Sequence, residues 1–120
     1  MEKLTSKEEQ AMRVLWKAGK GFVKDLLEDY PEPKPHYNTL SSLVRLLEEK
    51  GYVGHKAYGN THEYYPLISK EEYQREFMSD IVDSYFGKSY KNVVSFFARE
   101  QNISIEELKD IIKMIEKGRE

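Results

Sequence analysis

Residues 35–51 constrain the fold most, because they combine a helical apolar period with defined ends. Four apolar residues recur at the spacing that places them on one helix face: Leu40, Leu43, Val44 and Leu47. Pro35 precedes the repeat, where a missing N–H is harmless, and Gly51 follows it, where a left-handed residue can end a helix. The opposite face is polar and nearly uncharged near its start, with His36, Tyr37, Asn38, Ser41 and Ser42.

This polar face has two readings when the stretch is taken alone. Short hydrogen-bonding side chains suit base edges in the major groove of DNA, and amides at a helix start suit phosphate oxygens. An ordinary amphipathic helix with a weakly polar outer face has the same pattern. The segments on either side must decide between the two readings.

Two helices are predicted before this stretch and a β-hairpin after it. Thr5 or Ser6 opens a first helix with a capping box, and an apolar stripe runs to Gly19. Lys20-Gly21 is expected to be a connection, and residues 22–30 to form a second helix that stops at two prolines. Residues 52–58 and 61–67 are β-prone and flank Gly59-Asn60, a tight-turn pair. Pro66 favours an edge position for the return strand.

Three helices followed by a two-stranded hairpin are the order of a winged helix-turn-helix. In that layout the third helix enters the major groove and the hairpin, called the wing, flanks it. The fold class predicted from the sequence is therefore mainly α with a small β-hairpin: a DNA-binding head over residues 1–68 and a helical dimerisation arm over residues 69–120.

The arm is predicted to contain three amphipathic helices. Ser69 with Glu72 and Ser104 with Glu107 form capping-box patterns, and a shorter helix runs from Tyr90 to about residue 100. The arm carries more large apolar residues than a small appendage can bury alone, and a two-fold dimer would cover them. The expected dimerisation residues are Phe77, Ile81, Tyr85, Phe86, Val93, Val94, Phe97, Leu108, Ile111, Ile112 and Ile115.

Composition narrows the functional classes. The 120 residues include no cysteine, which excludes disulfides, thiolate metal sites and cysteine nucleophiles and fits a reducing cytoplasm. No apolar run reaches membrane-spanning length and no signal-peptide h-region follows the first residues, so a cytoplasmic location is expected. Residues 1–66 hold ten basic and ten acidic side chains, which gives no bulk attraction for nucleic acid.

An enzyme is not expected. His62-Glu63 begins like a zinc-protease motif, but no second histidine follows at the required spacing. His55 and His62 could face each other across the hairpin, yet two histidines without a nearby carboxylate or thiolate make a poor metal site. The chain has no glycine-rich phosphate loop and no nucleophile elbow. No cofactor or metal is expected.

The chain resembles the penicillinase-repressor family, the BlaI/MecI type of winged-helix repressors. The resemblance rests on residues 4–16, 38–46, 50–53, 64–67 and 93–98, and it covers nearly the whole length. It implies a homodimer that binds an inverted-repeat operator in duplex DNA and represses a resistance or stress operon. Ser41 stands where relatives often have an arginine, which implies a different operator sequence.

The resemblance and the polar face together give one set of candidate DNA contacts. In the family the start of the third helix reads the major groove and the wing touches the backbone, which carries over to Asn38, Thr39, Ser41 and Ser42 and to wing residues that include His62. Lys50 and Lys56 are candidates for phosphate contact. The full expected set is His36, Tyr37, Asn38, Thr39, Ser41, Ser42, Arg45, Lys50, His55, Lys56, Tyr58 and Asn60.

Family members differ in how they are inactivated. In some, a membrane-bound sensor protease triggers cleavage at an Asn-Phe bond in the arm, and the matching pair here is Phe96-Phe97, without the asparagine. The copper-responsive branch carries cysteines that this chain lacks. A possible sensor protease and a possible inactivation site at Phe96 and Phe97 are therefore expectations, and copper sensing is not expected.

Two other functions stay open on the sequence alone. A winged-helix module that binds protein without sequence-specific DNA binding is favoured by the neutral first half. A ligand-sensing regulator would need a pocket, whereas the apolar stripes of the arm are typical of a dimer seam. Salt-dependent binding to duplex DNA separates the first alternative from a repressor.

Overall fold

The computed structural model describes residues 1–100 and 103–119, and within the last helix the side chains of 112 and 114–119 lie outside the description. The chain forms two compact units, Met1–Glu76 and Phe77–Glu120, and each is described by itself. The division expected between residues 68 and 69 stays a prediction. No helix in the described residues is long and apolar enough to cross a lipid bilayer.

The first unit begins with helix α1, Ser6–Ala18, and its start is fixed by the predicted capping box. The Thr5 side chain accepts a hydrogen bond from the backbone N–H of Glu8, and the Glu8 carboxylate accepts one from the backbone N–H of Thr5. At the other end, Gly19 adopts a φ of 86° and donates to the Leu15 carbonyl. The predicted helix and both of its ends are confirmed.

The segment after α1 differs from the prediction. Gly21–Phe22 form a short strand, β1, rather than a connection, and helix α2 covers only Val23–Glu28. β1 pairs antiparallel with residues more than forty positions later, with Gly21 opposite Tyr64 and Phe22 opposite Glu63. The sheet therefore has three strands instead of the two that were expected.

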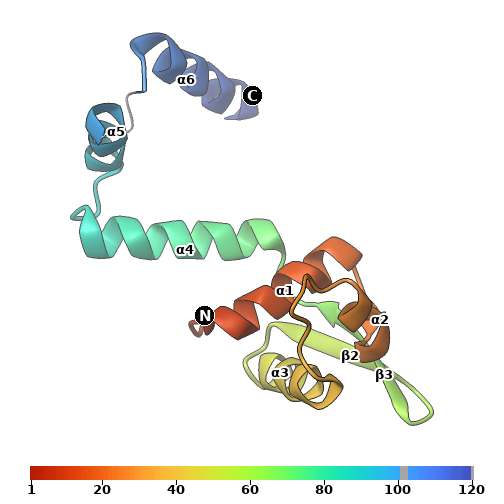
Figure 1. The fold of residues 1–120 in the computed structure, drawn as a ribbon. Coiled ribbons are helices and arrows are strands. Elements are labelled where there is room, and N and C mark those ends of the chain that lie inside the picture. Colours follow the sequence, from red (N-terminus) through yellow and green to blue (C-terminus); the bar gives the residue numbers. More distant parts are fainter. Residues whose placement is uncertain (101–102, 120) are drawn as a thin grey trace. The chain divides into compact units, whose positions relative to one another are not determined.

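Helix α3, Tyr37–Glu49, and the hairpin follow as predicted. His36 is the N-cap of α3 and Gly51 adopts a φ of 82° just beyond its end. Strands β2, Val53–Tyr58, and β3, Thr61–Pro66, are joined at Gly59-Asn60, where Gly59 has a φ of 62°. Figure 1 shows the loop of this hairpin extending beyond α1, α2 and α3.

The strand order is β1-β3-β2, so β3 lies at the centre of the sheet. The expectation that Pro66 places the return strand at an edge is wrong. Pro66 pairs with Val53 on β2, while β1 covers only Glu63 and Tyr64 on the other side of β3. Because β1 ends before it reaches Pro66, the missing N–H of the proline is not needed by a third strand.

One apolar core holds α1, α2, α3 and the sheet together. The stripe predicted for α3 is its centre: Leu40, Val44 and Leu47 are at most 2% exposed. The other buried members of this core are Ala11, Met12, Val14, Leu15, Val23, Leu26, Tyr30, Tyr52, Val53 and Tyr64. Each large side chain buried here contributes about 1.5–3 kcal/mol to folding, so α3 cannot rotate about its axis without losing several such terms.

The second unit contains most of α4 and two further helices. α4 spans Lys70–Tyr85, α5 spans Tyr90–Glu100 and α6 spans Ile105–Arg119, close to the predicted limits. Ser69 and Ser104 accept hydrogen bonds from the backbone N–H groups of Glu72 and Glu107, as the capping patterns predicted. Among the described side chains of this unit, Val82 and Val93 are the buried apolar residues.

Candidate nucleic-acid interface

The exposed face of α3 carries most of the polar residues that the sequence singled out. His36, Asn38, Thr39, Ser42 and Arg45 are exposed, and the Tyr37 side chain is 52% exposed. Ser41 is half-buried on the flank of the helix. The buried stripe on the opposite side fixes this orientation, because turning these side chains inward would expose the core.

The hairpin divides its candidate residues between two faces. Side chains alternate along a strand, so Lys56 and Tyr58 lie on one face of β2 and His55 on the other. Lys56 Nζ sits 5.3 Å from the centre of the Tyr58 ring, which also packs against Phe22. Asn60 lies in the loop between the strands. The structure therefore does not bring all the expected wing contacts to one surface.

The face of the hairpin that carries His55 meets α3 through Glu48. His55 Nδ1 lies 2.6 Å from Glu48 Oε2, and both side chains are about one-third exposed. The His55 and His62 rings are stacked, with centroids 4.1 Å apart and planes within 9°. The two histidines face each other as predicted, but the sequence interpretation missed the carboxylate beside them.

Spacing along α3 held a signal for Glu48. Tyr37, Ser41 and Glu48 recur at intervals of four and seven residues and share the flank next to the hairpin. The electrostatics of the adjoining Tyr64 ring also place Glu48 and Arg45 near it. Burial raises the pKa of Tyr64, the Glu48 charge raises it further, and the Arg45 charge lowers it. Within the described part of the chain, no three histidine and acidic side chains are grouped to hold a metal ion.

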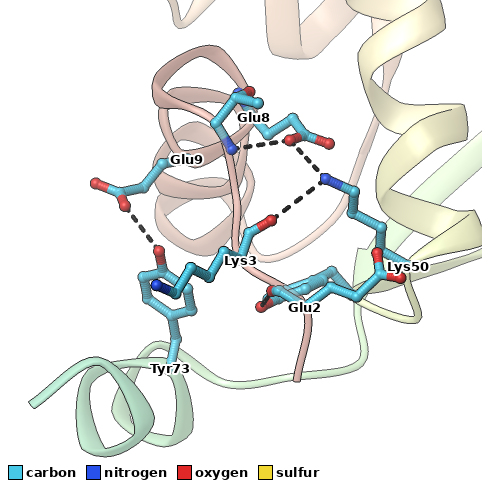
Figure 2. Close-up of polar contacts among 8 residues, drawn as sticks. Glu2, Lys3, Glu8, Glu9, Lys50 and Tyr73 are labelled. Atoms are coloured by element: carbon cyan, nitrogen blue, oxygen red, sulfur yellow. Dashed lines mark hydrogen bonds and ion pairs between the residues drawn. The ribbon is translucent and has the colours of Figure 1, made fainter. Parts of the chain in front are cut away.

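Lys50 is placed differently from the other candidates. Its ammonium lies 2.8 Å from Glu8 Oε1 and 3.3 Å from the Lys3 carbonyl oxygen, as Figure 2 shows. The Lys50 side chain is 23% exposed and that of Glu8 is 3% exposed. Lys50 therefore fastens the end of α3 to the start of α1, and its charge is already neutralised there.

The Glu8 carboxylate is the centre of this network. Burial acts to raise the pKa of Glu8, but hydrogen bonds from Lys50 and Thr5 outweigh it and lower the pKa below its ordinary value. On the neighbouring side, the Tyr73 hydroxyl at the start of α4 donates to Glu9 over 2.7 Å (Figure 2). The Trp16 indole N–H donates to the Ile68 carbonyl over 2.9 Å. The first turns of α4 are thus part of the first unit.

Charge on the candidate interface is sparse. Arg45 is the basic side chain within α3, and Glu48 and Glu49 follow it. Lys20 near the sheet lies 3.8 Å from Glu63, so its charge is also partly balanced. The surface offers hydrogen-bonding groups for base edges and few cations for phosphates.

The expected dimerisation residues differ in exposure within the second unit. Tyr85 is 80% exposed, and Phe77, Val94, Phe97 and Ile111 are between 39% and 49% exposed. Ile81, Phe86 and Leu108 are half-buried, and Val93 is buried within its own unit. The side chains of Ile112 and Ile115 lie outside the described residues. Phe96, 37% exposed, packs edge-on against both Phe86 and Phe97.

The chain is similar to known proteins in sequence and in fold. The chain is 17% identical over 115 residues to the methicillin resistance regulatory protein MecI of Staphylococcus aureus strain N315, covering 95% of this chain and 94% of that protein. MecI of Mammaliicoccus sciuri is 16% identical over the same length. The solution structure of the DNA-binding domain of the repressor BlaI matches 61% of this chain and 94% of its own, with a TM-score of 0.52 and 22% identity.

The BlaI comparison identifies the fold of the first unit as a winged helix. The family model described as penicillinase repressor matches residues 4–117, which include both units. The chain therefore belongs to the penicillinase repressor family, a family of transcriptional repressors.

Proposed function

We propose that this protein is a homodimeric repressor that binds an inverted-repeat operator in duplex DNA and controls a resistance or stress operon. The observation that carries the proposal is the exposed polar face at the start of α3, held outward by the buried stripe of Leu40, Val44 and Leu47. A helix presented in this way, with a hairpin beside it, matches the docking geometry of winged helix-turn-helix proteins.

The exposed residues have distinct roles in this proposal. Asn38 can pair with adenine through two hydrogen bonds, and Thr39 and Ser42 can contact bases or nearby phosphates. Arg45 supplies a cation farther along the same face, and Tyr37 can pack on the sugar-phosphate backbone. Lys56 and Asn60 on the hairpin are the proposed backbone contacts of the wing. Lys50 is left out, because its ammonium is bound to Glu8.

The exposed apolar side chains of the arm support dimerisation. Tyr85, Val94, Phe97 and Ile111 would be covered by a second copy of the chain. Two heads joined in this way bind two half-sites with an avidity that neither head has alone. The relatives named as methicillin resistance regulators support a resistance or stress operon as the target.

Inactivation by a membrane sensor protease stays a prediction. The pair Phe96-Phe97 lies in the middle of α5, with both side chains partly exposed. A protease needs an extended substrate, so cleavage at this bond requires local opening of the helix. A repressor cut there would lose α6 from its arm.

A gel-shift titration with the DNA upstream of the protein's own gene tests the proposal, at a low and a high salt concentration and with unrelated DNA alongside. A repressor gives tight retardation that favours the upstream DNA and weakens with salt, because phosphate contacts release counterions. Binding that is no tighter than to unrelated DNA would contradict the proposal. That result would favour the alternative of a winged-helix module that binds protein.

A further inference from the structure

All three histidines of the chain lie on or next to α3, the helix proposed to face DNA. His36 caps the start of α3, and His55 and His62 lie on the face of the hairpin that meets this helix. Histidine is the side chain whose charge normally changes between pH 5 and 8. The charge of a surface with few other cations therefore depends strongly on these three side chains.

The hairpin register explains why two of them stack. His55 is opposite Tyr64 and His62 is opposite Ala57, so the histidines are diagonal neighbours on one face. Their rings lie 4.1 Å apart, and each also packs against the Tyr64 ring, at 5.8 Å and 6.2 Å between centroids. The stack is therefore held on one side by a buried tyrosine.

The charged groups around this stack come from two elements. The Glu48 carboxylate of α3 lies 2.6 Å from His55 Nδ1, and Arg45 and Tyr37 of the same helix lie near the adjoining Tyr64 ring. Lys56 and Glu63 on the strands alternate to the other face of the sheet. Glu48 is thus the anion in direct contact with His55.

Protonation changes the sign of this cluster. With both imidazoles neutral, Glu48 leaves one negative charge on this cluster. A proton on His55 cancels that charge, and a proton on His62 makes the cluster positive. Two stacked cations repel each other, so the second proton needs a further anion nearby. A DNA phosphate is an anion of the required kind.

We propose that His55 and His62, with Glu48 beside His55, form a proton-dependent binding site for a DNA phosphate, so that DNA binding takes up protons at the wing. This inference rests on the proposed DNA-binding function. Binding and protonation are linked reciprocally: a proton that favours DNA is in turn favoured by DNA. Affinity for DNA should therefore rise as pH falls through the histidine range.

Fluorescence anisotropy of the full-length protein with labelled duplex from upstream of its gene tests this site. The dissociation constant is measured at about pH 6 and about pH 8, each over a range of salt concentrations. We expect about tenfold tighter binding at the lower pH, which over these two pH units corresponds to an average net uptake of about half a proton. The slope of log affinity against log salt should also be steeper by about one unit there, since one more phosphate is neutralised.

Variants of the three histidines and of Glu48 show which side chains cause the pH dependence of DNA affinity. The double variant H55Q/H62Q should lose the increase in affinity between the higher and the lower pH. H36Q removes the third histidine and should keep most of the increase. E48Q removes the negative charge beside His55 and should reduce the difference in affinity between the two pH values. Circular dichroism establishes that each variant is folded.

The outcomes separate the two proposals. If the parent binds DNA and H55Q/H62Q retains the full pH dependence, the phosphate site is wrong and the repressor proposal stands. If H36Q alone removes the dependence, the site is also wrong. If the parent binds no DNA at either pH, the proposed function fails and the phosphate site fails with it.

Discussion

Lys50 and Lys56 have the same chemistry and different surroundings. Lys50 follows the last turn of α3 and its ammonium contacts the nearly buried Glu8 carboxylate, whereas Lys56 is exposed on the hairpin. An ion pair that is largely removed from water costs desolvation energy, and removing one partner leaves the other charge uncompensated. Burial therefore makes Lys50 a structural residue and leaves Lys56 available to a ligand.

We expect Lys50→Met to lower the free energy of unfolding by about 3 kcal/mol, because Glu8 would keep a buried charge without its partner. Lys56→Met is the matched control and should change the stability by less than about 0.5 kcal/mol. Urea denaturation at neutral pH measures both. Equal stabilities for the two variants would contradict the structural role of Lys50.

Asn38 and Arg45 belong to the exposed face of α3, so replacing them should change DNA binding rather than stability. Asn38→Ala should weaken binding to the preferred DNA by about 1–3 kcal/mol and reduce the preference over unrelated DNA, because a base contact is lost.

Arg45→Ala should weaken binding to both DNAs if it contacts phosphate, and lower the salt slope by about one unit. Anisotropy titrations measure these effects. Unchanged affinity in both variants would contradict the proposal that α3 contacts DNA.

Helices α1 and α3 depend on each other through one carboxylate. Glu8 completes the capping box of α1 and also holds Lys50 at the end of α3 (Figure 2). Since the pKa of Glu8 is lowered in the folded protein, its stabilising contribution is fully present above the unfolded-state pKa, near 4.5. The contribution is lost as pH falls below that value through the folded-state pKa.

The free energy of unfolding of the parent should therefore decrease as pH is lowered from about 4.5. Glu8→Gln should be less stable than the parent at neutral pH and should lose less stability over the same acidic range. Thermal unfolding followed by circular dichroism across that range measures the difference. Parallel curves for parent and variant would show that Glu8 does not carry this dependence.

The helices and the hairpin could be predicted from the sequence because each has a local signature. The period of α3, the capping box at Thr5 and the turn at Gly59-Asn60 involve residues close together in the chain. Strand β1 could not be predicted, because two residues have no period and their partner is a distant strand. The central place of β3 follows from that same pairing.

The parts of the candidate site that lie within one element could be predicted from the sequence. The contacts between separate elements could not. The polar face of α3 was evident from its own spacing, as was the chance that His55 and His62 meet across a hairpin. The contact of Glu48 with His55 and that of Lys50 with Glu8 join separate elements. Such contacts depend on how the elements pack together, and the spacing of residues within one element does not predict that packing.

The whole molecule, in our proposal, is two heads held by a dimeric arm. Val94→Asp should weaken dimerisation, because Val94 is 49% exposed on α5 and a carboxylate there would be buried in the interface. Binding to an inverted-repeat DNA should weaken in parallel, with the head still folded. Arg99→Glu, which places a carboxylate elsewhere on α5, is the control. Sedimentation velocity measures the oligomeric state, and an unchanged dimer would exclude this face of α5.

The balanced charge of the head has a consequence for how an operator would be found. Arg45 is accompanied by Glu48 and Glu49, and Lys20 and Lys50 are paired with carboxylates, so long-range attraction to a polyanion is weak. Electrostatic steering is what speeds association and lets proteins slide along random DNA. In our proposal, a protein with weak steering spends little time on non-cognate sequence and searches mainly through free diffusion, and the fit of α3 to the bases would set the time it remains on a site.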